Sequence, residues 1–410
     1  MLKVVFDLNS LSKVLIFEEK ITGLTRVINE LSMALLAIDK HNYDVFLQLS
    51  SFKYPQASVY LDNIFGELGY PDKIILSSKV GSAFYKVIVT NNLPLYKGQL
   101  LGKFISLFEK KNEIPDIFHS PFYPFPSKFQ NNKTVHLITI HDVIALTRPE
   151  FFTEISQKKF LSLFEEISKS ADHFISVSEH TKNEFCEFYN VSPKRITTVP
   201  LAASTVLFSP EDNLSIIQAV KNRYRIPEGE YILSVATLEP RKNIAGLIKA
   251  FYELLQDTQR KDLYLVLSGK VGWKMDKIIT NLNINNLLKK YIIFTGHVDD
   301  NDLRALYSGA LFFAYPSFIE GFGLPPLEAM QCGTPVISSN VSSIPEVVGD
   351  AGILIDPHSG DDLCHAMWQL LNNDKLRSNL ASKGLERSKN FSWDKTAKMT
   401  LDLYRYLANS

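Results

Sequence analysis

The segment from Ala310 to Pro357 constrains the fold more than any other part of the chain, because short apolar runs alternate there with chain-breaking residues. The apolar, aromatic run from Ala310 to Tyr315 predicts a buried strand, and Pro316 ends it because proline cannot donate a hydrogen bond to a sheet. Val336 to Ser339 follows Thr-Pro and predicts the next strand. The segment therefore predicts strand, loop, short helix and strand, which is typical of an α/β fold with a parallel sheet.

The loop and helix between these two strands contain the residues of a phosphate site. Gly321 and Gly323 allow the backbone to come close to a ligand. Pro326 suits the first helical position, Glu328 then falls in the first helical turn, and Gly333 lies where such a helix would end. In a parallel sheet this loop lies at the carboxyl edge, and the free amides of a helix N-terminus favour an anion. The pattern therefore predicts a phosphate-containing ligand.

Two glutamates flank this predicted phosphate site. Taken singly, Glu320 is explained as a solvated loop acid and Glu328 as an acid that offsets the helix dipole. Taken together, they favour a ligand with a sugar at each end, because carboxylates accept hydrogen bonds from vicinal hydroxyls. A nucleotide-sugar is such a ligand.

These motifs resemble the retaining glycosyltransferases of the GT-B fold, the group 1 or family 4 type, which includes bacterial mannosyltransferases. In the run from Pro316 to Pro357, Glu320 and Glu328 are followed by Gly-Thr-Pro-Val, Ile-Pro-Glu-Val and Gly-Asp-Ala-Gly. The likeness covers most of the chain and is weakest between Tyr54 and Lys111. Three further motifs carry it: Ser234-Val-Ala-Thr-Leu-Glu-Pro-Arg-Lys-Asn243, Gly296-His-Val298 and Ile140-His-Asp142.

The resemblance implies an α/β fold with two Rossmann-like domains that face a cleft. A chain of 410 residues also exceeds what one hydrophobic core usually supports. We expect residues 1–205 to form the acceptor-side domain and residues 206–391 the nucleotide-sugar-binding domain, because the composition turns polar after Leu201. Residues 392–410 are expected to form a C-terminal helix that crosses back onto the first domain.

The resemblance also implies an activity. It predicts retaining transfer of a hexose from a nucleotide-diphosphate sugar, GDP-mannose by the overall pattern, to a glycan or lipid-linked acceptor in surface-polysaccharide biosynthesis. In this reading Glu320 holds hydroxyls of the donor sugar and Glu328 holds the ribose. His141, at the end of the predicted strand Val135–Ile140, steadies the sugar from the opposite domain. UDP-glucose, UDP-N-acetylglucosamine and deoxysugar donors stay open, and nothing in the sequence identifies the acceptor.

Arg241 and Lys242 are the candidate partners of the donor diphosphate. They follow the predicted strand Tyr231–Val235 and precede an apolar helix, at the carboxyl edge of the second sheet. Solvated surface charges are the alternative reading, but a diphosphate needs cations, and arginine offers a planar fork and lysine a point charge. Many family members have an arginine several residues before the lysine, where this chain has Ala236-Thr-Leu238.

The remaining candidate ligand contacts come from the backbone. Gly23 is either a helix-start glycine or, by resemblance, a close approach to the donor phosphate and acceptor. By resemblance, Val298 reads the base through its backbone. Phe322, Gly323 and Leu324 contribute the loop at the start of the short helix.

Several cofactors and partners are disfavoured. Asp299 to Asp302 are read as a helix cap and first turn, and the resemblance implies a metal-independent enzyme without a cofactor. No Gly-x-Gly-x-x-Gly joins the first strand to its helix, which argues against a nicotinamide dinucleotide. Basic and acidic residues number 44 each, which argues against a nucleic-acid partner. The three cysteines have no metal-ligand spacing and indicate a reducing compartment: Cys186, Cys332 and Cys364.

The expected location is the cytoplasm, with peripheral contact to the inner face of the membrane left open. Leu2 to Leu8 reads as a strand rather than a signal peptide, and no apolar run reaches the length of a membrane span. Leu100 to Phe108 has an apolar helical stripe with lysines around it. This helix is expected to pack on the core of its own domain, or alternatively to rest on an anionic membrane.

Two other functions are weighed against glycosyl transfer. A nucleotide-sugar epimerase of similar fold would consume a UDP-sugar without an acceptor. A sugar-nucleotide sensor would bind the donor without turning it over.

Overall fold

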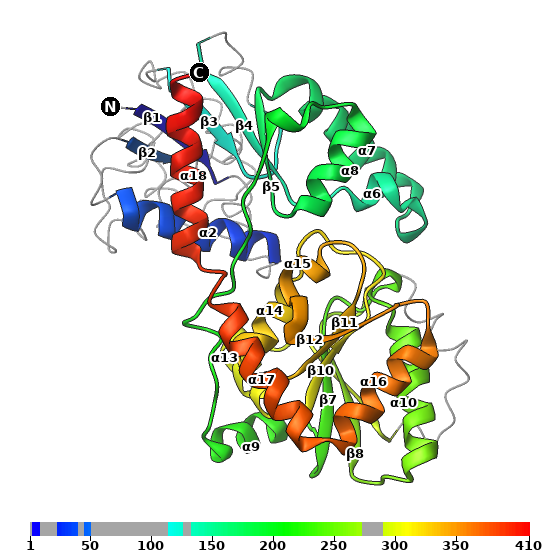
Figure 1. Ribbon diagram of the computed structural model, residues 1–410. Helices are drawn as coiled ribbons and strands as arrows, with labels where there is room; N and C mark the ends of the chain where they lie inside the picture. The colour runs from blue at the N-terminus through cyan, green and yellow to red at the C-terminus, as the bar shows by residue number, and fades with distance from the viewer. Residues whose placement is uncertain (1, 9–22, 40–44, 51–113, 126–132, 273–289) are drawn as a thin grey trace, which may run out of the picture.

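The computed structural model describes residues 2–8, 23–39, 45–50, 114–125, 133–272 and 290–410. These residues form two parallel six-stranded sheets, each with helices packed against it (Figure 1). The strand orders are β2-β1-β3-β4-β5-β6 and β12-β11-β10-β7-β8-β9. The expected α/β fold with two Rossmann-like sheets is therefore confirmed.

The first sheet uses the apolar runs of the N-terminal half. Most of the described side chains on its strands are buried, and the partly exposed ones lie at strand ends, because the strands are mainly apolar and carry few charges. The strands are β1 (Leu2–Asp7), β2 (Val45–Ser50), β3 (Ile117–Ser120), β4 (Val135–Ile140), β5 (His173–Ser176) and β6 (Ile196–Thr198). The helical segments are α2 (Gly23–Asp39), α6 (Ile144–Thr147), η3 (Pro149–Phe151), α7 (Glu154–Ser170), α8 (Glu179–Tyr189) and η4 (Pro193–Arg195).

The second sheet is built from the C-terminal half. Its central strands are fully buried, since helices cover both faces. The strands are β7 (Glu230–Val235), β8 (Leu263–Ser268), β9 (Ile292–Gly296), β10 (Phe312–Tyr315), β11 (Val336–Ser339) and β12 (Gly352–Ile355). The helical segments are α9 (Leu214–Arg223), η5 (Pro240–Lys242), α10 (Ile244–Thr258), α13 (Asp300–Ser308), α14 (Leu324–Gln331), α15 (Ile344–Val348), η6 (Gly349–Ala351), α16 (Gly360–Asn372) and α17 (Asp374–Ser388).

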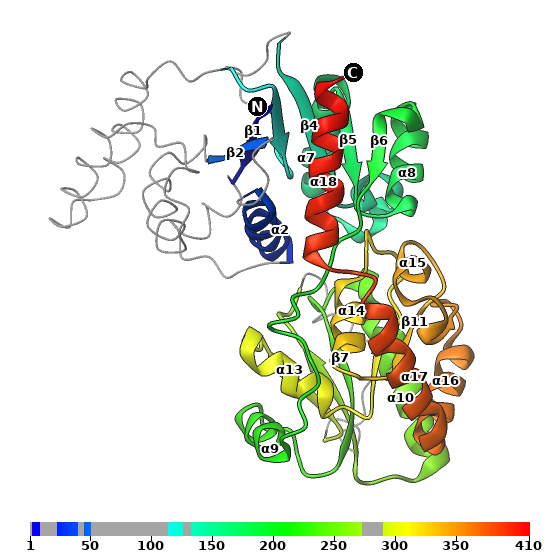
Figure 2. The same cartoon turned by 60° about the vertical axis from the view of Figure 1, so that its left-hand side comes forward.

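The last helix, α18 (Trp393–Ala408), leaves the second sheet and lies against the first (Figures 1 and 2). Ser392 caps it by accepting a hydrogen bond from the Lys395 amide at 3.2 Å. Leu401 and Tyr404 join the core of the first sheet with α2, and the Tyr404 hydroxyl lies 2.6 Å from Nδ1 of His119. The predicted C-terminal crossing helix is therefore confirmed.

The short helix α14 begins earlier than its sequence indicates. We expected Pro326 at the first helical position, but α14 starts at Leu324, with Pro325 and Pro326 inside the first turn. Prolines are tolerated there because those N–H groups would have no intrahelical partner. The prediction that Glu328 falls in the first turn is therefore wrong: Glu328 is the fifth helical residue. The predicted end is close to the observed one, and Gly333 has a left-handed φ of 73°.

The predicted helix from Leu100 to Phe108, with its alternative membrane contact, lies outside the described residues.

Candidate active site

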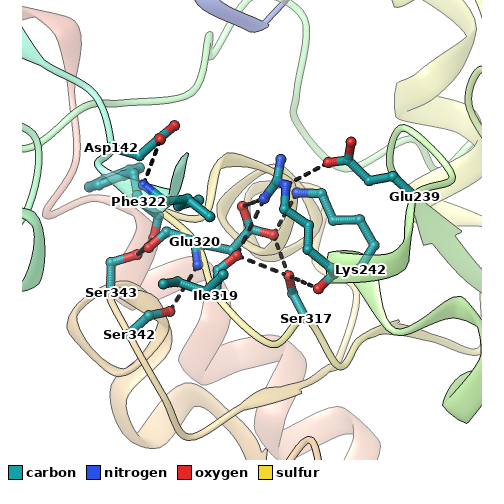
Figure 3. A network of polar contacts seen from close by, with 12 residues as sticks. Asp142, Glu239, Lys242, Ser317, Ile319, Glu320, Phe322, Ser342 and Ser343 are labelled. Carbon is teal, nitrogen blue, oxygen red and sulfur yellow. Dashed lines mark hydrogen bonds and ion pairs between the residues drawn. The ribbon is translucent and has the colours of Figure 1, made fainter. Parts of the chain in front are cut away.

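Glu320 lies at the centre of a buried ionic network in the loop between β10 and α14 (Figure 3). Its Oε1 accepts hydrogen bonds from Nζ of Lys242 and Oγ of Ser317, each at 2.5 Å, and from the Tyr315 hydroxyl at 2.9 Å. Its Oε2 accepts one from Nη1 of Arg241 at 2.9 Å. The structure therefore brings together three residues that the sequence singled out.

Arg241 and Lys242 reach Glu320 from η5, at the carboxyl end of β7. Lys242 is 7% exposed, and its Nζ also donates to the Tyr315 hydroxyl at 2.6 Å. Arg241 is anchored on its other side by Glu239, whose carboxylate lies 2.5 Å from Nε. The pair is therefore part of a buried network, and the reading as ordinary solvated charges is wrong.

The cations keep Glu320 ionised. Burial alone would raise the pKa of Glu320, but the charges of Arg241 and Lys242 outweigh it and lower the pKa to about 2. Burial and the neighbouring Arg241 lower the pKa of Lys242 to about 8, against the opposing pull of Glu320. Near neutral pH Glu320 is therefore negatively charged between two positive charges, Arg241 and Lys242.

The loop after Glu320 is fixed by two serines that precede α15. The Glu320 amide donates to Oγ of Ser342 at 3.0 Å. Oγ of Ser343 donates to the carbonyls of Glu320 and Phe322, at 2.9 and 2.8 Å (Figure 3). Because the backbone is bonded on both sides, the loop holds the Glu320 carboxylate in one position.

The start of α14 offers few backbone donors to an anion. Pro325 and Pro326 have no N–H, so the amides of Gly323 and Leu324 are the donors available where the helix begins. Gly323 has a φ of 120°, which side chains rarely adopt, and a Cβ there would lie 2.9 Å from Cδ1 of Ile344. Phe322 is buried, with its ring edge-to-face on Phe391 at 5.9 Å, so it contributes packing on this face of the loop.

His141 follows β4 and comes to the same loop from the first sheet. A Cβ at Gly321 would lie 2.0 Å from the His141 carbonyl oxygen, so the two backbones are in direct contact. The Nε2–H of His141 donates to the Pro121 carbonyl at 2.8 Å, which leaves Nδ1 as the acceptor nitrogen. Burial lowers the pKa of His141, so the ring is neutral near pH 7.

Glu328 is surrounded differently from Glu320. Its Oε2 accepts from the Tyr307 hydroxyl at 2.9 Å, and its Oε1 accepts from Nη1 of Arg26 at 3.0 Å. Arg26 belongs to α2 of the first sheet and also pairs with Asp300 at the start of α13. Burial raises the pKa of Glu328, and the charge of Arg26 opposes that rise. The second glutamate of the motif is therefore bound by a residue of the other half of the chain.

Gly23 and Val298 lie close in sequence to this second cluster. Gly23 is the exposed first residue of α2, three residues before Arg26, and among the described residues no atom outside its chain neighbours and its own helix backbone lies within 4 Å of where its Cβ would be. Val298 follows β9, is buried, and stands two residues before Asp300. The structure thus associates the Gly23, Val298 and Glu328 predictions with one cluster, and the His141, Arg241, Lys242 and Glu320 predictions with another.

Other hydrogen bonds join the two halves beside the site. The Gly321 carbonyl accepts from Oγ of Ser178 at 2.7 Å and from Oγ1 of Thr181 at 3.1 Å. The Glu346 carboxylate accepts from the amides of Glu179 and His180, at 2.9 and 2.8 Å, where α8 begins. The glutamate loop is therefore held against the first sheet in this arrangement.

Sequence reasoning missed Arg26, Tyr307 and Tyr315, although two had a usable signal. Tyr315 is the last residue of a predicted strand, a position that lies at the carboxyl edge of a parallel sheet. Arg26 lies three residues after Gly23 on a predicted helix. Tyr307 carried no signal, since it fits the apolar stripe of α13 equally well.

Within the described parts of the chain, no three histidine, cysteine, aspartate or glutamate side chains are grouped closely enough to bind a metal ion. No helix in the same ranges is long and apolar enough to cross a bilayer.

Comparisons with known proteins agree with this architecture. The sequence model of a family described as glycosyl transferases group 1 matches residues 217–387, and that of glycosyltransferase family 4 matches residues 21–205. Among solved structures, sucrose-phosphate synthase from Thermosynechococcus elongatus has a TM-score of 0.66 at 18% identity, covering 100% of both chains. WaaG, a glycosyltransferase involved in lipopolysaccharide biosynthesis, has a TM-score of 0.63 at 16% identity, covering 98% of this chain and 99% of that one.

Two similar sequences come from Escherichia coli. O-antigen chain mannosyltransferase B is 37% identical over 293 residues, which are 71% of this chain and 74% of the relative. The serotype-specific mannosyltransferase WbdA is 33% identical over 299 residues, 71% of this chain but 36% of the relative, so the chain spans about a third of that protein. The similarity at this identity and coverage, together with the two family matches and the two parallel sheets, establishes that the chain belongs to the GT-B glycosyltransferases of the group 1 or family 4 type.

Proposed function

We propose that this glycosyltransferase moves mannose from GDP-mannose to a glycan or lipid-linked acceptor in surface-polysaccharide biosynthesis, with retention of the anomeric configuration. The observation that carries the proposal is the buried, ionised Glu320 between Arg241 and Lys242, beside the start of α14. The choice of mannose is supported by the names of the two similar E. coli proteins, both mannosyltransferases.

In this proposal the two cations stabilise the leaving diphosphate. Lys242 uses two of its three N–H donors on Tyr315 and Glu320, so one is left for a phosphate oxygen. Arg241 uses Nε and Nη1 on Glu239, Ile319 and Glu320, and its Nη2 makes no hydrogen bond to a described residue. Both cations therefore keep a donor for the charge that collects on the diphosphate, and the amides of Gly323 and Leu324 add two more.

Glu320 and His141 would bind the donor sugar from its two sides. Oε1 of Glu320 already accepts three hydrogen bonds, but Oε2 accepts one, from Arg241, so it has a site for a sugar hydroxyl. His141 is neutral and its Nδ1 accepts a hydroxyl hydrogen, while its backbone touches Gly321 next to Glu320. The two groups belong to different sheets, so the sugar would lie where the halves of the chain meet.

The bond changes follow from this arrangement. The acceptor oxygen forms a bond to C1 of the sugar while the C1–O bond to the diphosphate breaks, and the acceptor proton passes to a phosphate oxygen of the donor. We assign Glu320 no role as nucleophile, because ion pairs hold both of its oxygens and lower its basicity. Charge stabilisation at the diphosphate would supply most of the rate enhancement.

The proposal divides the chain by role. Residues 1–205 would bind the acceptor, and residues 206–391 the nucleotide through Glu328 and the Val298 backbone. Residues 392–410 would tie the two together through α18. Gly23 would approach the phosphate or acceptor, and Phe322 would shape the loop. A cytoplasmic location, with contact to the inner face of the membrane, stays a prediction.

Calorimetric titration with GDP, UDP and ADP, without added metal, tests this function before an acceptor is known. We expect GDP to bind wild type at micromolar strength, and Glu328→Ala to bind about tenfold more weakly, which corresponds to about 1.4 kcal/mol. Tighter binding of UDP would replace GDP-mannose by a UDP-sugar as donor. The proposal fails if no nucleotide binds, or if Glu328→Ala binds as wild type does.

Incubation with donor alone separates the competing enzyme class. An epimerase converts a UDP-sugar without acceptor, whereas the proposed transferase shows at most slow hydrolysis. With an acceptor found, the anomeric configuration of the product tests retention. A sensor would bind nucleotide and show neither reaction.

A further inference from the structure

Arg26 links the two halves of the chain at the second glutamate. Its Nη1 donates to Glu328 at 3.0 Å and its Nη2 pairs with Asp300, so one guanidinium holds two carboxylates of the second half. The Arg26 side chain is 21% exposed and the Glu328 side chain 6%. The guanidinium also lies 5.8 Å from the centre of the Phe208 ring. The Glu328 side of this contact is therefore buried, whereas the Arg26 and Asp300 side is partly exposed.

The acids around Arg26 outnumber it. Arg26 of α2, Tyr307 and Asp300 of α13, and Cys332 at the end of α14 all lie near Glu328. Glu30, one turn after Arg26 on α2, adds a further nearby carboxyl. Among the described groups Arg26 is the cation that acts directly on Glu328, while Asp300 acts on it with like charge.

We propose that Arg26 is a positioning residue for the ribose end of the donor site, which would make nucleotide binding by the second half depend on a side chain of the first. The inference rests on the proposed function, in which Glu328 accepts the ribose hydroxyls. It adds a residue from α2 that determines where the Glu328 carboxylate points and whether it is charged.

Simultaneous binding of Arg26 and ribose is compatible with the chemistry of a carboxylate. Each oxygen of Glu328 has two lone-pair sites, and the structure fills one on each oxygen, with Arg26 and Tyr307. One site per oxygen is left for the two vicinal hydroxyls. The Nε of Arg26 is buried and has no partner among the described residues, so a donor is also left for a ligand oxygen.

Removing Arg26 should therefore change the protonation of Glu328. Burial and Asp300 both raise the pKa of Glu328, and without Arg26 only the Tyr307 hydrogen bond opposes them. A protonated carboxyl loses acceptor capacity for the ribose. Nucleotide affinity in Arg26→Ala should then weaken as the pH falls, since the fraction of ionised Glu328 falls with it.

The experiment is calorimetric titration of GDP between pH 5.5 and 8.5 into wild type and Arg26→Ala, with thermal unfolding to confirm that each variant folds. We expect Arg26→Ala to bind about tenfold more weakly at pH 7, and the deficit to grow towards pH 5.5. Arg26→Lys keeps the charge but lacks the fork that spans two carboxylates, so it should restore the pH profile and only part of the affinity.

Two further variants separate this role from a general effect. Adding Asp300→Asn to Arg26→Ala removes the like charge beside Glu328 and should recover part of the lost affinity. Arg223→Ala is the control. It breaks another arginine-aspartate pair, in which Nη1 of Arg223 lies 2.7 Å from Oδ2 of Asp302 on α13, and it should leave nucleotide affinity unchanged. Recovered nucleotide affinity in the double variant and unchanged affinity in Arg223→Ala would support the inference.

The outcomes distinguish failure of this inference from failure of the proposed function on which it rests. If wild type binds GDP, Glu328→Ala loses that binding and Arg26→Ala keeps it at every pH, the positioning role is overturned and the function stands. Tighter binding by Arg26→Ala overturns the role as well, because it means that Arg26 competes with the nucleotide. If neither wild type nor any variant binds a nucleotide, both are overturned.

Discussion

Glu320 and Glu328 lie on the same loop and helix, and both are buried, but the structure surrounds them in opposite ways. Two cations next to each other in the sequence, Arg241 and Lys242, neutralise Glu320. One cation from the other half of the chain, Arg26, contacts Glu328. Despite burial, the pKa of Glu320 is lowered to about 2, whereas burial leaves the pKa of Glu328 raised.

The difference indicates that the charges of the two glutamates depend on different parts of the chain. Glu320, Arg241 and Lys242 all belong to the second half, so the charge of Glu320 is set within one sheet and its loops. The charge of Glu328 depends on how α2 lies against α13 and α14. The groups that act directly on the charge of Glu320 therefore all lie in the second half, whereas Glu328 depends on Arg26 of the first half.

The largest expected effect comes from removing Glu320. Glu320→Ala leaves Lys242 as a buried cation without a carboxylate partner and Arg241 with Glu239 alone, so the free energy of unfolding should fall by about 3–5 kcal/mol. Donor turnover should fall by about 100-fold or more, because sugar binding and cation placement are lost together. Urea unfolding and an assay of released nucleotide measure the two quantities.

Glu239→Ala is the matched control for that change, since Glu239 pairs with Arg241 and leaves the Glu320 contacts in place. We expect a smaller loss of both stability and turnover than in Glu320→Ala. Equal losses in the two variants would mean that Glu239 is as important as Glu320 for stability and turnover, which would contradict the role given to Glu320.

The pH dependence of turnover tests the cation side of the comparison. Lys242 has a pKa lowered to about 8, and it must be protonated to stabilise the diphosphate. The protonated fraction falls as the pH rises through 8, so kcat/KM should fall about tenfold per pH unit beyond it. Lys242→Arg should abolish this alkaline limb, because arginine stays charged; an unchanged limb would assign the titration to another group.

The contributions of the two glutamates to stability should change in opposite directions as the pH falls. The folded-state pKa of Glu320 is below its ordinary value of 4.5, so its contribution is present above pH 4.5 and is lost as the pH falls towards 2. The folded-state pKa of Glu328 is raised, so its contribution is present below 4.5 and is lost as the pH rises through the raised value.

Urea unfolding of Glu320→Gln and Glu328→Gln against wild type, from pH 7 to pH 3, measures these contributions. As the pH falls, the stability advantage of wild type over Glu320→Gln should shrink, and its advantage over Glu328→Gln should grow. The same direction for both variants would contradict the claim that their surroundings are opposite.

The sequence alone predicted the sheets and the Glu320 end of the site well. The run that became β10 is apolar and ends before Pro316, and the run that became β11 begins after Pro335, so one end of each strand is determined locally. Arg241 and Lys242 directly follow a predicted strand, which placed them at the carboxyl edge where Glu320 also lies. Local patterning was sufficient because each residue of this cluster lies just beyond a strand.

The Glu328 end could not be predicted in the same way. Arg26 is separated from Glu328 by 302 positions, and they meet only when two sheets pack against each other. The start of α14 was also misplaced, because Pro325 and Pro326 both satisfy the requirements of a first turn. Because α14 starts two residues earlier than predicted, Glu328 lies in the second turn, where it contacts Tyr307 and Arg26 rather than the helix N-terminus.

The smallest predicted effect asks whether the ribose end depends on Arg26 itself or only on how the halves are arranged. Glu346 joins the halves too, by accepting hydrogen bonds from the first amides of α8, but it is not among the groups that act on the charge of Glu328. Glu346→Gln should cost about 0.3–1 kcal/mol, the usual value of an acid at a helix N-terminus, and weaken GDP binding less than about fivefold. Calorimetry compares it with Arg26→Ala. If Glu346→Gln weakens binding as much as Arg26→Ala does, then the arrangement of the halves, and not the guanidinium, distinguishes Glu328 from Glu320.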